Sequence, residues 1–315
     1  MELVEYTPEF EADWNEFVAR SKNATFMFNR GYMEYHSDRF EDKSLICYYK
    51  NDPIALFPAN VTENEMISHG GLTFGGFLTS NRVKTPKIME LFEELTTYAE
   101  RQGLERIIYK CIPYIYHNYP ASEDRYGLFR HDAHLTRRDV TTVISRPNHP
   151  EFQKNRRRKI ADAEDAGLQV RESTDFRTYW DILEINLDEE HDVEPVHTLE
   201  EIELLHDRFP DNIRLIASFE EGQMVGGVVI YQSEQVARTQ YIANSNRGRE
   251  VGALDIVFDR LIHGNLISTE YLDLGISTED AGRYLNEGLV FFKEGFGGEG
   301  SFTTSTRFQL EPIEN

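Results

Sequence analysis

The chain has 315 residues, and its 33 basic and 55 acidic residues give a net charge of −22. That length allows one large domain or two smaller ones. A hydrophobic fraction of 40% with 12% aromatic residues excludes a disordered chain. The two cysteines, Cys47 and Cys111, exclude a disulfide scaffold and a zinc site built from cysteines alone. The acidic excess also disfavours nucleic acid as a partner, because binding phosphates needs clustered Lys and Arg.

No apolar run approaches the roughly 20 residues that a membrane span needs. The first five residues, Met1 to Glu5, include two glutamates and lack the basic-then-apolar pattern of a signal peptide. We therefore expect a cytoplasmic protein without a membrane span.

The acidic residues are concentrated in the second half of the chain. Residues 1–150 carry a net charge of −5, and residues 151–315 carry −17. The basic cluster Lys154–Lys159 directly precedes the acidic segment 161–210. This cluster either binds a nucleotide or another anion, or it pairs with the acidic residues that follow. The acidic surplus itself is either an adaptation to high salt or ordinary surface bias.

The first half of the sequence predicts alternating helices and strands. Phe10, Trp14 and Phe17 recur at helical spacing within a helix expected over 8–20. A second helix is expected over 86–102, with Pro86 near its start and Gly103 after its end. Strands are expected at 44–49, 53–60, 65–72, 105–112 and 140–145. Two prolines in residues 146–150 suit neither a helix nor a central strand, so we place a unit boundary between residues 147 and 148.

The second half predicts helix, helix and three strands, followed by a polar loop. The Arg-rich segment reads as a helix ending at Gly167, and Phe176, Trp180 and Leu187 mark a second helix. Thr198 has capping-box spacing to Glu201 and starts a third. Strands are expected at 213–219, 223–231 and 235–243, then a polar loop at 244–250 and an amphipathic helix. A strand at 271–274, a short helix around 280–289 and a strand at 302–308 complete the prediction.

This order of elements resembles the N-acetyltransferase (GNAT) fold. In that family the loop after the fourth strand cradles the pyrophosphate of coenzyme A with the pattern Q/R-x-x-G-x-G/A. Here Arg249-Glu250-Val251-Gly252-Ala253-Leu254 supplies the Arg and the first Gly, while Leu254 replaces the last small residue. The resemblance implies acyl-CoA as the donor substrate, held by Arg247, Gly248, Arg249, Gly252 and Ala253. The alternative is the first turn of an amphipathic helix without a ligand.

The tail of the sequence extends this resemblance. Phe292-Lys293-Glu294-Gly295-Phe296-Gly297-Gly298 resembles the FemABX-like branch of the superfamily, which joins two GNAT-like units in one chain. The segments 28–33, 68–76 and 195–198 add to it. The chain looks like the bacterial FemAB-related acyltransferases found with surface-polysaccharide genes. The implied fold class is α/β (α+β), with two tandem GNAT-like units at 1–147 and 148–315. Each unit is a mixed, mostly antiparallel sheet flanked by helices.

The resemblance implies an acyltransferase. We expect an N-acyltransferase that moves an acyl group from acyl-CoA to an amino group of a sugar or sugar nucleotide in cell-surface polysaccharide synthesis. One alternative is a peptidoglycan-bridge ligase that uses aminoacyl-tRNA, as FemABX ligases proper do. The net charge disfavours this donor, and the basic cluster Lys154–Lys159 keeps it open. The other alternative is a catalytically inactive GNAT-fold module for binding or assembly.

Acyl transfer needs a base for the acceptor proton and donors for the oxyanion. His69 lies in a glycine-rich segment, and an ordinary histidine pKa near 6.5 suits a base at neutral pH. Glu279 and Asp273, near the ends of predicted strands, are further candidate catalytic bases. Each also has a structural interpretation. His69 could be a hydrogen-bonded histidine in a turn, Glu279 a charge in the first turn of a helix, and Asp273 an outward-pointing strand residue.

Six polar residues are candidates for binding substrate. Lys293 could neutralise a phosphate or an oxyanion, or it could be a solvated lysine before a loop. Arg283 and Asn286 lie three apart on the predicted short helix, so that they can face one pocket. The other three are Arg30, Tyr32 and His36, which follow the first helix and serve packing or acceptor contact. The histidines show no HExxH or similar spacing, so no metal is expected.

Overall fold

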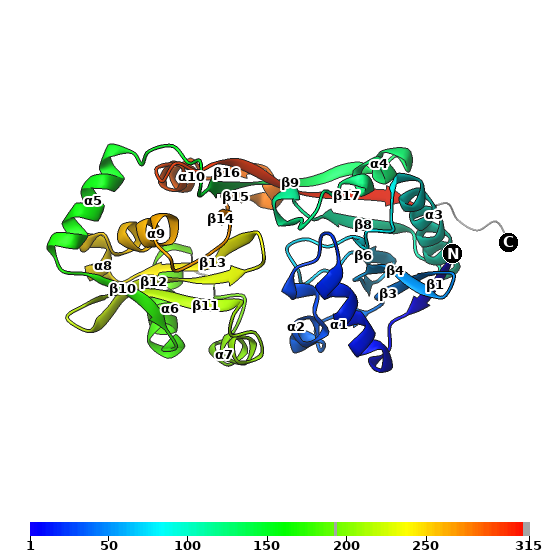
Figure 1. The fold of residues 1–315 in the computed structure, drawn as a ribbon, viewed down its shortest axis with the longest axis horizontal. Coiled ribbons are helices and arrows are strands. Elements are labelled where there is room, and N and C mark those ends of the chain that lie inside the picture. Colours follow the sequence, from blue (N-terminus) through cyan, green and yellow to red (C-terminus); the bar gives the residue numbers. More distant parts are fainter. Residues whose placement is uncertain (192–193, 311–315) are drawn as a thin grey trace. The chain divides into compact units, whose positions relative to one another are not determined.

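The computed structural model describes residues 1–191 and 194–310 (Figure 1). The chain divides into two compact units. Unit 1 comprises Met1–Asp139 together with the segment that begins at Phe302, and unit 2 comprises Val140–Ser301. The division therefore places the segment from Phe302 with the first unit, whereas the sequence analysis assigned it to the second.

Unit 1 contains two sheets. The first has the strand order β1-β3-β4-β7, with all neighbours antiparallel. Its strands are β1 (Glu2–Glu5), β3 (Leu45–Tyr49), β4 (Asp52–Phe57) and β7 (Leu78–Thr79). The second follows the order β17-β8-β6-β5-β2, in which the β6–β8 pair is parallel. Its strands are β2 (Glu41–Asp42), β5 (Asn60–Thr62), β6 (Glu65–Ile67), β8 (Arg106–Cys111) and the unit 1 part of β17 (Glu299–Gln309).

Helices complete unit 1. They are α1 (Glu11–Arg20), α2 (Arg30–Met33), α3 (Thr85–Arg101) and α4 (Glu123–Arg130), with single 3-10 turns η1 (Pro8–Phe10), η2 (Phe26–Phe28), η3 (Glu34–His36) and η4 (Tyr114–Tyr116). The helix predicted over 86–102 is confirmed as α3. Its apolar face buries Leu91, Phe92 and Leu95 in a core shared with both sheets, where the Phe92 ring packs on those of Phe77 and Tyr109.

Unit 2 has one main sheet with the order β10-β11-β12-β13-β14-β9. Its strands are β10 (Gln169–Ser173), β11 (Ile213–Glu220), β12 (Gln223–Gln232), β13 (Val236–Asn244), β14 (Tyr271–Ile276) and the unit 2 part of β9 (His134–Ser145). Its helices are α5 (Lys154–Asp165), α6 (Phe176–His191), α7 (Leu199–Arg208), α8 (Asn246–Val251), α9 (Ala253–His263) and α10 (Glu287–Glu294). A small ribbon of β15 (Thr278–Glu279) and β16 (Tyr284–Leu285) flanks η5 (Asp280–Gly282).

The pairing of β13 determines where this sheet opens. β13 pairs with β14 in parallel, and the register covers Val236–Arg238 against Tyr271–Asp273. Beyond these residues β13 continues to Asn244, paired with β12 alone. The β12–β13 register also shifts, since Val229 faces Tyr241 and Ile230 faces Thr239, which leaves Gln240 as the extra residue of a β-bulge. The regular hydrogen bonding between β12 and β13 is thus interrupted next to the point where β13 and β14 separate.

Helices cover both faces of β11, β12 and β13 (Figure 1). Leu254, Val257 and Phe258 of α9 join Ile216 and Val228 in one apolar core. On the other face lie α6 and α7. The predicted capping box at the start of α7 is confirmed, because the Thr198 side chain accepts from the Glu201 amide and the Glu201 side chain accepts from the Thr198 amide. In the described part of the chain, none of the helices is both long and apolar enough to cross a membrane.

Two sequence predictions for unit 2 are wrong. The loop expected at 244–250 contains the short helix α8, which Ser245 caps by accepting a hydrogen bond from the Gly248 amide at 3.0 Å. The helix expected around 280–289 is replaced by η5, β16 and then α10, which begins at Glu287. Ala281 has a φ of +51°, which no continuous α-helix contains.

Candidate functional site

One face of α6 carries large polar and aromatic side chains in unit 2. Arg177, Trp180, Asp181 and Glu184 are spaced i, i+3, i+4 and i+7, which places them on the same side of the helix. The helix start is fixed by Asp175, whose carboxylate accepts the Thr178 amide at 3.1 Å. The sequence of α6 therefore aligns these four side chains along a common surface.

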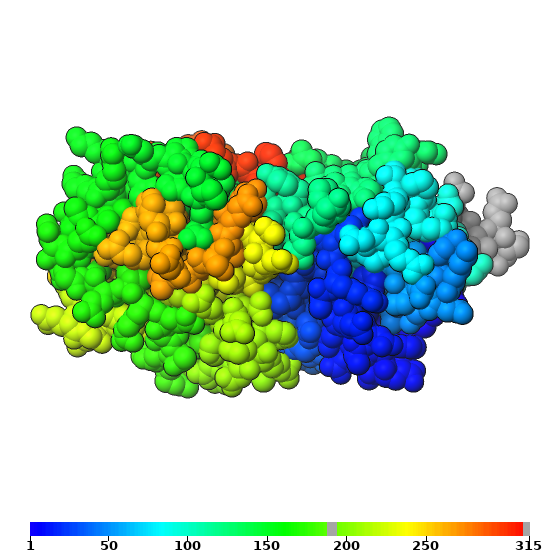
Figure 2. All heavy atoms as spheres, viewed as in Figure 1, coloured from blue at the N-terminus to red at the C-terminus, as the bar shows by residue number. Residues whose placement is uncertain are grey.

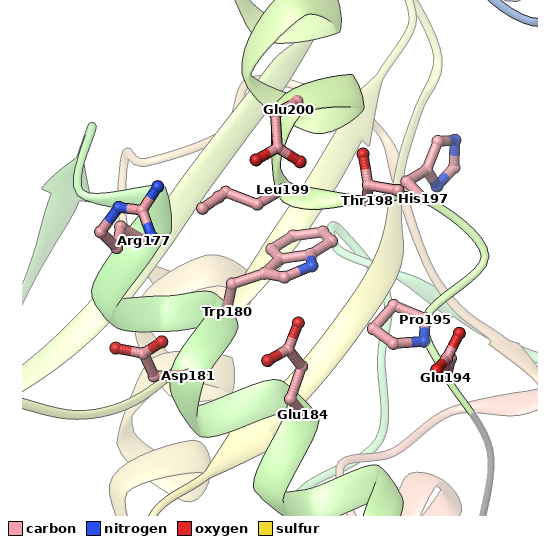
Figure 3. A pocket seen from close by; sticks show the side chains of 10 residues that line it. All are labelled: Arg177, Trp180, Asp181, Glu184, Glu194, Pro195, His197, Thr198, Leu199 and Glu200. Atoms are coloured by element: carbon pink, nitrogen blue, oxygen red, sulfur yellow. The ribbon is translucent and has the colours of Figure 1, made fainter.

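This surface and the connection to α7 line an open cavity of about 840 Å³ (Figure 3). Besides the four α6 residues, the lining consists of Glu194, Pro195, His197, Thr198, Leu199 and Glu200. Figure 3 shows the Trp180 ring in the middle of this group, with Glu184 below it, Glu200 above it, and Pro195 and Glu194 to its right. A cavity of this volume accommodates a small-molecule ligand.

The cavity is strongly acidic. Asp181, Glu184, Glu194 and Glu200 contribute four carboxylates, and Arg177 contributes one guanidinium. None of these carboxylates has an ion pair or hydrogen bond with any residue that the structure describes. Trp180 is 2% exposed, and its indole N–H likewise has no hydrogen-bond acceptor among those residues. Unpaired carboxylates beside an aromatic ring attract an ammonium group and repel phosphates.

Trp180 and His197 connect the cavity to β13. The Trp180 and Tyr241 rings meet edge to face with centroids 5.1 Å apart. The Tyr241 hydroxyl accepts the His197 backbone N–H at 3.1 Å and lies 2.5 Å from His197 Nδ1. Tyr241 directly follows the bulged Gln240. The cavity therefore adjoins the part of β13 that has separated from β14.

Asp273 lies at the point where the two strands separate. It is fully buried on β14, where Thr141 Oγ1 and the Gly275 amide donate to its Oδ1, and Arg238 Nη1 lies 3.8 Å from its Oδ2. The Thr239 hydroxyl of β13 is 3.5 Å from the Asp273 backbone oxygen. Asp273 thus holds the end of β14 against β9 and β13, although the sequence analysis offered it as a candidate base or an outward-pointing residue.

Lys293 of α10 reaches the same strand end. Its Nζ donates to the backbone oxygens of Gly275 at 2.8 Å and Ile276 at 2.7 Å, and the residue is 3% exposed. Burial lowers the pKa of Lys293 to about 7, while the Asp273 carboxylate opposes and the Arg238 guanidinium reinforces that shift. A buried amine with a pKa near neutrality can give or take a proton under physiological conditions.

Arg30, His36 and His69 come together in unit 1. The rings of His36 and His69 lie 5.6 Å apart, and both residues are buried. His69 and Arg30 line a cavity of about 240 Å³ with Tyr6 and Asp42. Burial lowers the pKa of His36 to about 4 and that of His69 to about 3. Both rings are neutral at pH 7, so His69 is a much weaker base than the ordinary histidine assumed from the sequence.

The remaining unit 1 candidates have structural partners. Arg30 is 2% exposed; it donates to Glu34 at 2.9 Å, pairs with Asp42 and stacks 3.6 Å from the Tyr6 ring centroid. Tyr32 is buried and packs edge to face on Phe26, with ring centroids 5.6 Å apart. These contacts stabilise the segment that follows α1.

The expected pyrophosphate loop is covered by α5. Gly252 has a φ of +75°, and a Cβ built on it would lie 2.6 Å from the Lys159 backbone oxygen. The Lys159 ammonium donates to the Arg249 and Glu250 carbonyls, both at 3.3 Å. In the first turn of α9, Asp255 accepts from Arg156 at 2.9 Å. This helix start already has a carboxylate and a packed neighbour, so it does not fit a pyrophosphate as it stands.

The other members of the expected loop are also engaged. Arg247 donates to Glu220 at 2.8 and 2.7 Å and to Glu250 at 3.1 Å. Gly248 is buried in α8, where a Cβ would lie 2.1 Å from the Val225 backbone oxygen, and Ala253 is fully buried. Arg247 is thus neutralised by two carboxylates rather than available to an anion.

The three candidates around η5 do not share a helix. Arg283 ends η5 and is exposed. Asn286 caps α10 by accepting from the Leu289 amide at 3.0 Å, and its amide donates to Glu279 at 3.0 Å. Glu279 is exposed on β15. Asn286 and Glu279 therefore form a local pair at the start of α10, and Arg283 is separate from it.

The cavity residues Trp180, Glu184, Glu200 and Tyr241 were not among the candidates predicted from the sequence. The spacing of Trp180 indicated only an apolar helix face, and the acidic excess of residues 161–210 indicated no cavity. The acidic excess together with the 195–198 motif was the available signal. Among the described residues, no group of three or more His, Cys, Asp or Glu could hold a metal ion.

The fold is a tandem GNAT-like α/β architecture, in which each unit is a mixed sheet flanked by helices. Solved structures with this fold include FemX, with a TM-score of 0.70, 11% identity and 98% of both chains covered. L-PGS from Bacillus licheniformis has a TM-score of 0.63 and 13% sequence identity, and the match covers 99% of this chain and 94% of that one. A tandem GNAT protein from the clavulanic acid biosynthesis pathway has a TM-score of 0.51 and 10% sequence identity, and the match covers 99% of each chain. No family model and no curated protein matches the sequence.

Proposed function

We propose that the protein transfers an acyl group to an amine, and that unit 2 performs the reaction. The observation that carries this proposal is the acidic cavity beside β13, in which four unpaired carboxylates surround the buried Trp180. The fold is that of acyl-transferring proteins such as FemX and the tandem GNAT protein. The resemblance of the sequence to FemAB-related acyltransferases agrees with this class of reaction.

The acceptor is a small molecule that bears an ammonium group. Glu184 and Glu200, both exposed in the cavity lining, attract this cation. Because the same carboxylates repel phosphate, the part of the acceptor inside the cavity carries none. This narrows the sugar or sugar-nucleotide acceptor expected from the sequence to an amino sugar or another amine. A place in surface-polysaccharide synthesis stays a prediction.

Transfer requires that the ammonium first lose a proton. In this proposal the His197–Tyr241 pair accepts it, and the neutral amine then attacks the acyl carbonyl. The amide of the bulged Gln240 donates to the resulting oxyanion. When the tetrahedral intermediate collapses, the carbon–sulfur or carbon–oxygen bond breaks and the ammonium form of Lys293 protonates the departing thiolate or hydroxyl. The attacking nitrogen then gives its second proton to the neutral amine of Lys293, which leaves an amide and restores the ammonium form.

Two donors are compatible with this chemistry. Acyl-CoA is the donor that the GNAT resemblance implies, and its pyrophosphate would bind away from the start of α9 or after α5 moves. An aminoacyl ester of tRNA is the second candidate. It is favoured by one observation: Lys159 packs on the expected pyrophosphate loop, and Asp255 adds a carboxylate to the first turn of α9. The reaction at the acceptor is the same for both.

A donor–acceptor screen tests the proposal. Acetyl-CoA and charged tRNA are each offered with amino sugars, diamines and neutral hydroxyl acceptors, and the released thiol or uncharged tRNA is measured. We expect turnover with amines. We also expect Glu184→Gln/Glu200→Gln to raise KM for cationic acceptors about tenfold, since each lost charge weakens attraction by about 0.5–1 kcal/mol. Lys293→Met should lower kcat by about 100-fold or more.

Asp207→Asn on α7 is the matched control, because it removes one exposed carboxylate outside the cavity lining. It should leave KM unchanged. Turnover that prefers hydroxyl acceptors would contradict the amine assignment. Tight amine binding without transfer from either donor would instead support a GNAT-fold binding module.

A further inference from the structure

An apolar and basic surface lies on unit 1. Six large hydrophobic side chains are exposed in the described part of this unit. Five of them fall between residues 114 and 135, namely Tyr114, Tyr119, Tyr126, Phe129 and Leu135, and the sixth is Phe302. Phe129 is 72% exposed, which is unusual for a phenylalanine that serves only the fold.

Arginines accompany these side chains. Residues 123–139 carry four arginines and four carboxylates, but three of the carboxylates have partners: Glu123 pairs with Lys22, Asp124 accepts from Tyr109, and Asp139 pairs with Arg137. The guanidinium of Arg130 is 3.5 Å from the Tyr126 hydroxyl, and that of Arg138 lies 5.7 Å from the Phe302 ring centroid. Arg137 pairs with Asp139, whereas Arg125, Arg130 and Arg138 have no ion pair with any described residue.

The local fold holds the two parts of this surface together. Tyr126 and Phe129 are one turn apart on α4, with ring centroids 6.4 Å apart. After α4 the chain reverses at Asp132, which has a φ of +50°, and the Ala133 amide donates to Leu128 O at 3.0 Å. β9 then begins at His134 beside the end of the helix. Figure 2 shows atoms of this region at the surface of unit 1.

We propose that the surface formed by α4 and the start of β9 binds an anionic lipid bilayer. Aromatic and aliphatic side chains flanked by arginines suit the boundary between headgroups and acyl chains. The net charge of −22 makes the rest of the molecule unfavourable near such a bilayer, so this surface also sets the orientation of binding.

Charge complementarity favours lipid over nucleic acid. Three unpaired arginines are few for a nucleic acid, whose binding at physiological salt rests on roughly 6–10 phosphate contacts. A bilayer interface gains from the arginines and from the apolar side chains together, because each arginine adds electrostatic attraction and each apolar side chain, the non-aromatic Leu135 included, enters the bilayer boundary.

Flotation of the full-length protein with vesicles tests this proposal. Vesicles of phosphatidylcholine alone are compared with vesicles that contain about one third phosphatidylglycerol. We expect binding to the anionic vesicles, little binding to the neutral ones, and weaker binding in 1 M than in 0.1 M salt. Arg125→Ser and Arg130→Ser should each lower the partition coefficient about fivefold, and Phe129→Ser about tenfold or more.

Ile185→Ser is the matched control, because Ile185 is 55% exposed on α6 within the acidic unit. It should float like the wild type. Unchanged circular dichroism of the surface variants confirms that they are folded. Equal partition of wild type and Phe129→Ser, or no preference for anionic vesicles, would overturn the proposal. Retardation of tRNA in a gel that the same arginine variants abolish, without vesicle binding, would also overturn it in favour of a nucleic-acid surface.

Discussion

Lys293 makes the stability of the protein depend on pH in the alkaline range. Its folded-state pKa of about 7 lies below the ordinary lysine value of 10.5. Between these values the unfolded chain binds a proton that the native state does not, so the free energy of unfolding rises with pH. The slope from this one group reaches about 1.4 kcal/mol per pH unit. We expect the wild type to gain more stability than Lys293→Met between pH 7 and pH 10.

Denaturant unfolding at several pH values measures this difference. Lys154→Met provides the control, because Lys154 is an exposed lysine at the start of α5 and should not change the slope. Parallel stability curves for the wild type and Lys293→Met would show that Lys293 is not held in a site that penalises its charged form.

The histidine pair of unit 1 acts in the acid range. Burial depresses the folded pKa of His36 to about 4 and that of His69 to about 3, from an ordinary 6.5. The stability contributed by the neutral rings is present above pH 6.5 and is lost as pH falls through these folded values. Two such groups give a slope of up to about 2.7 kcal/mol per pH unit. We expect His36→Gln/His69→Gln to be markedly less acid-sensitive than the wild type in urea unfolding.

The surroundings of these rings explain the expected effect. Among the described residues, neither ring nitrogen of His36 has a hydrogen-bond partner, and a Cβ on Gly71 would lie 2.3 Å from His36 Nε2. A proton on His36 would therefore be poorly compensated. His134→Gln, at an exposed position, serves as the comparison. An acid transition that is identical in the double variant and in His134→Gln would refute the assignment.

At the scale of elements, the contact between α5 and the start of α9 can be isolated with two glycines. Gly252 and Gly167 have nearly equal φ values of +75° and +73°. A Cβ on Gly167 meets nothing within 4 Å, whereas one on Gly252 would lie 2.6 Å from Lys159 O. Alanine at either position costs about 1 kcal/mol for the left-handed backbone. We expect Gly252→Ala to cost a further 1–3 kcal/mol or so from the clash.

Equilibrium unfolding of both variants gives the comparison. If Gly252→Ala and Gly167→Ala lowered the free energy of unfolding equally, α5 would not pack firmly on Gly252. In that case the start of α9 would be open to an anion, and the argument against a pyrophosphate at this position would fail.

Elements with strong local signals were predictable from the sequence. The apolar stripe of α3 and the capping box of Thr198 and Glu201 appear as expected, because both depend on residues close in the chain. α8 was missed because a polar, glycine-containing stretch reads as a loop, although Ser245 as a helix cap was a readable signal. The region of η5 was misassigned because Ala281 has a left-handed conformation, which alanine rarely adopts and which no residue of the segment signals.

The candidate site was less predictable, because its parts are distant in sequence. His197 and Tyr241 meet through a hydroxyl although 44 positions separate them. Trp180 belongs to an apolar helix stripe by spacing, and only the cavity reveals that its N–H faces an opening. The environment of Lys293 depends on carbonyl groups of β14, which no side-chain pattern encodes. Local motifs therefore indicated the fold, and tertiary contacts determined the site.

At the scale of the whole molecule, the charge is unevenly compensated. Unit 2 has ion pairs such as Arg214–Glu172, Arg247–Glu220 and Arg260–Glu164, yet its acidic residues far outnumber its basic ones. In α5 the basic residues lie at the start, and Asp162 and Asp165 lie at the end. This order opposes the helix dipole, which favours anions at the start and cations at the end. The native state thus contains repulsion that added salt can screen.

We therefore expect the free energy of unfolding to rise with KCl concentration. The Debye length falls from about 10 Å at 0.1 M to about 3 Å at 1 M, which removes most of the repulsion between exposed carboxylates. A gain of about 1 kcal/mol or more in the free energy of unfolding is expected, since one like-charge pair at close range costs about that much in water.

Urea unfolding at matched KCl and NaCl concentrations separates screening, which is equal for both salts, from a specific potassium effect. Asp162→Asn/Asp165→Asn should be more stable than the wild type at 0.1 M and should respond less to salt. A flat response of the wild type would show that the acidic surplus is ordinary surface bias.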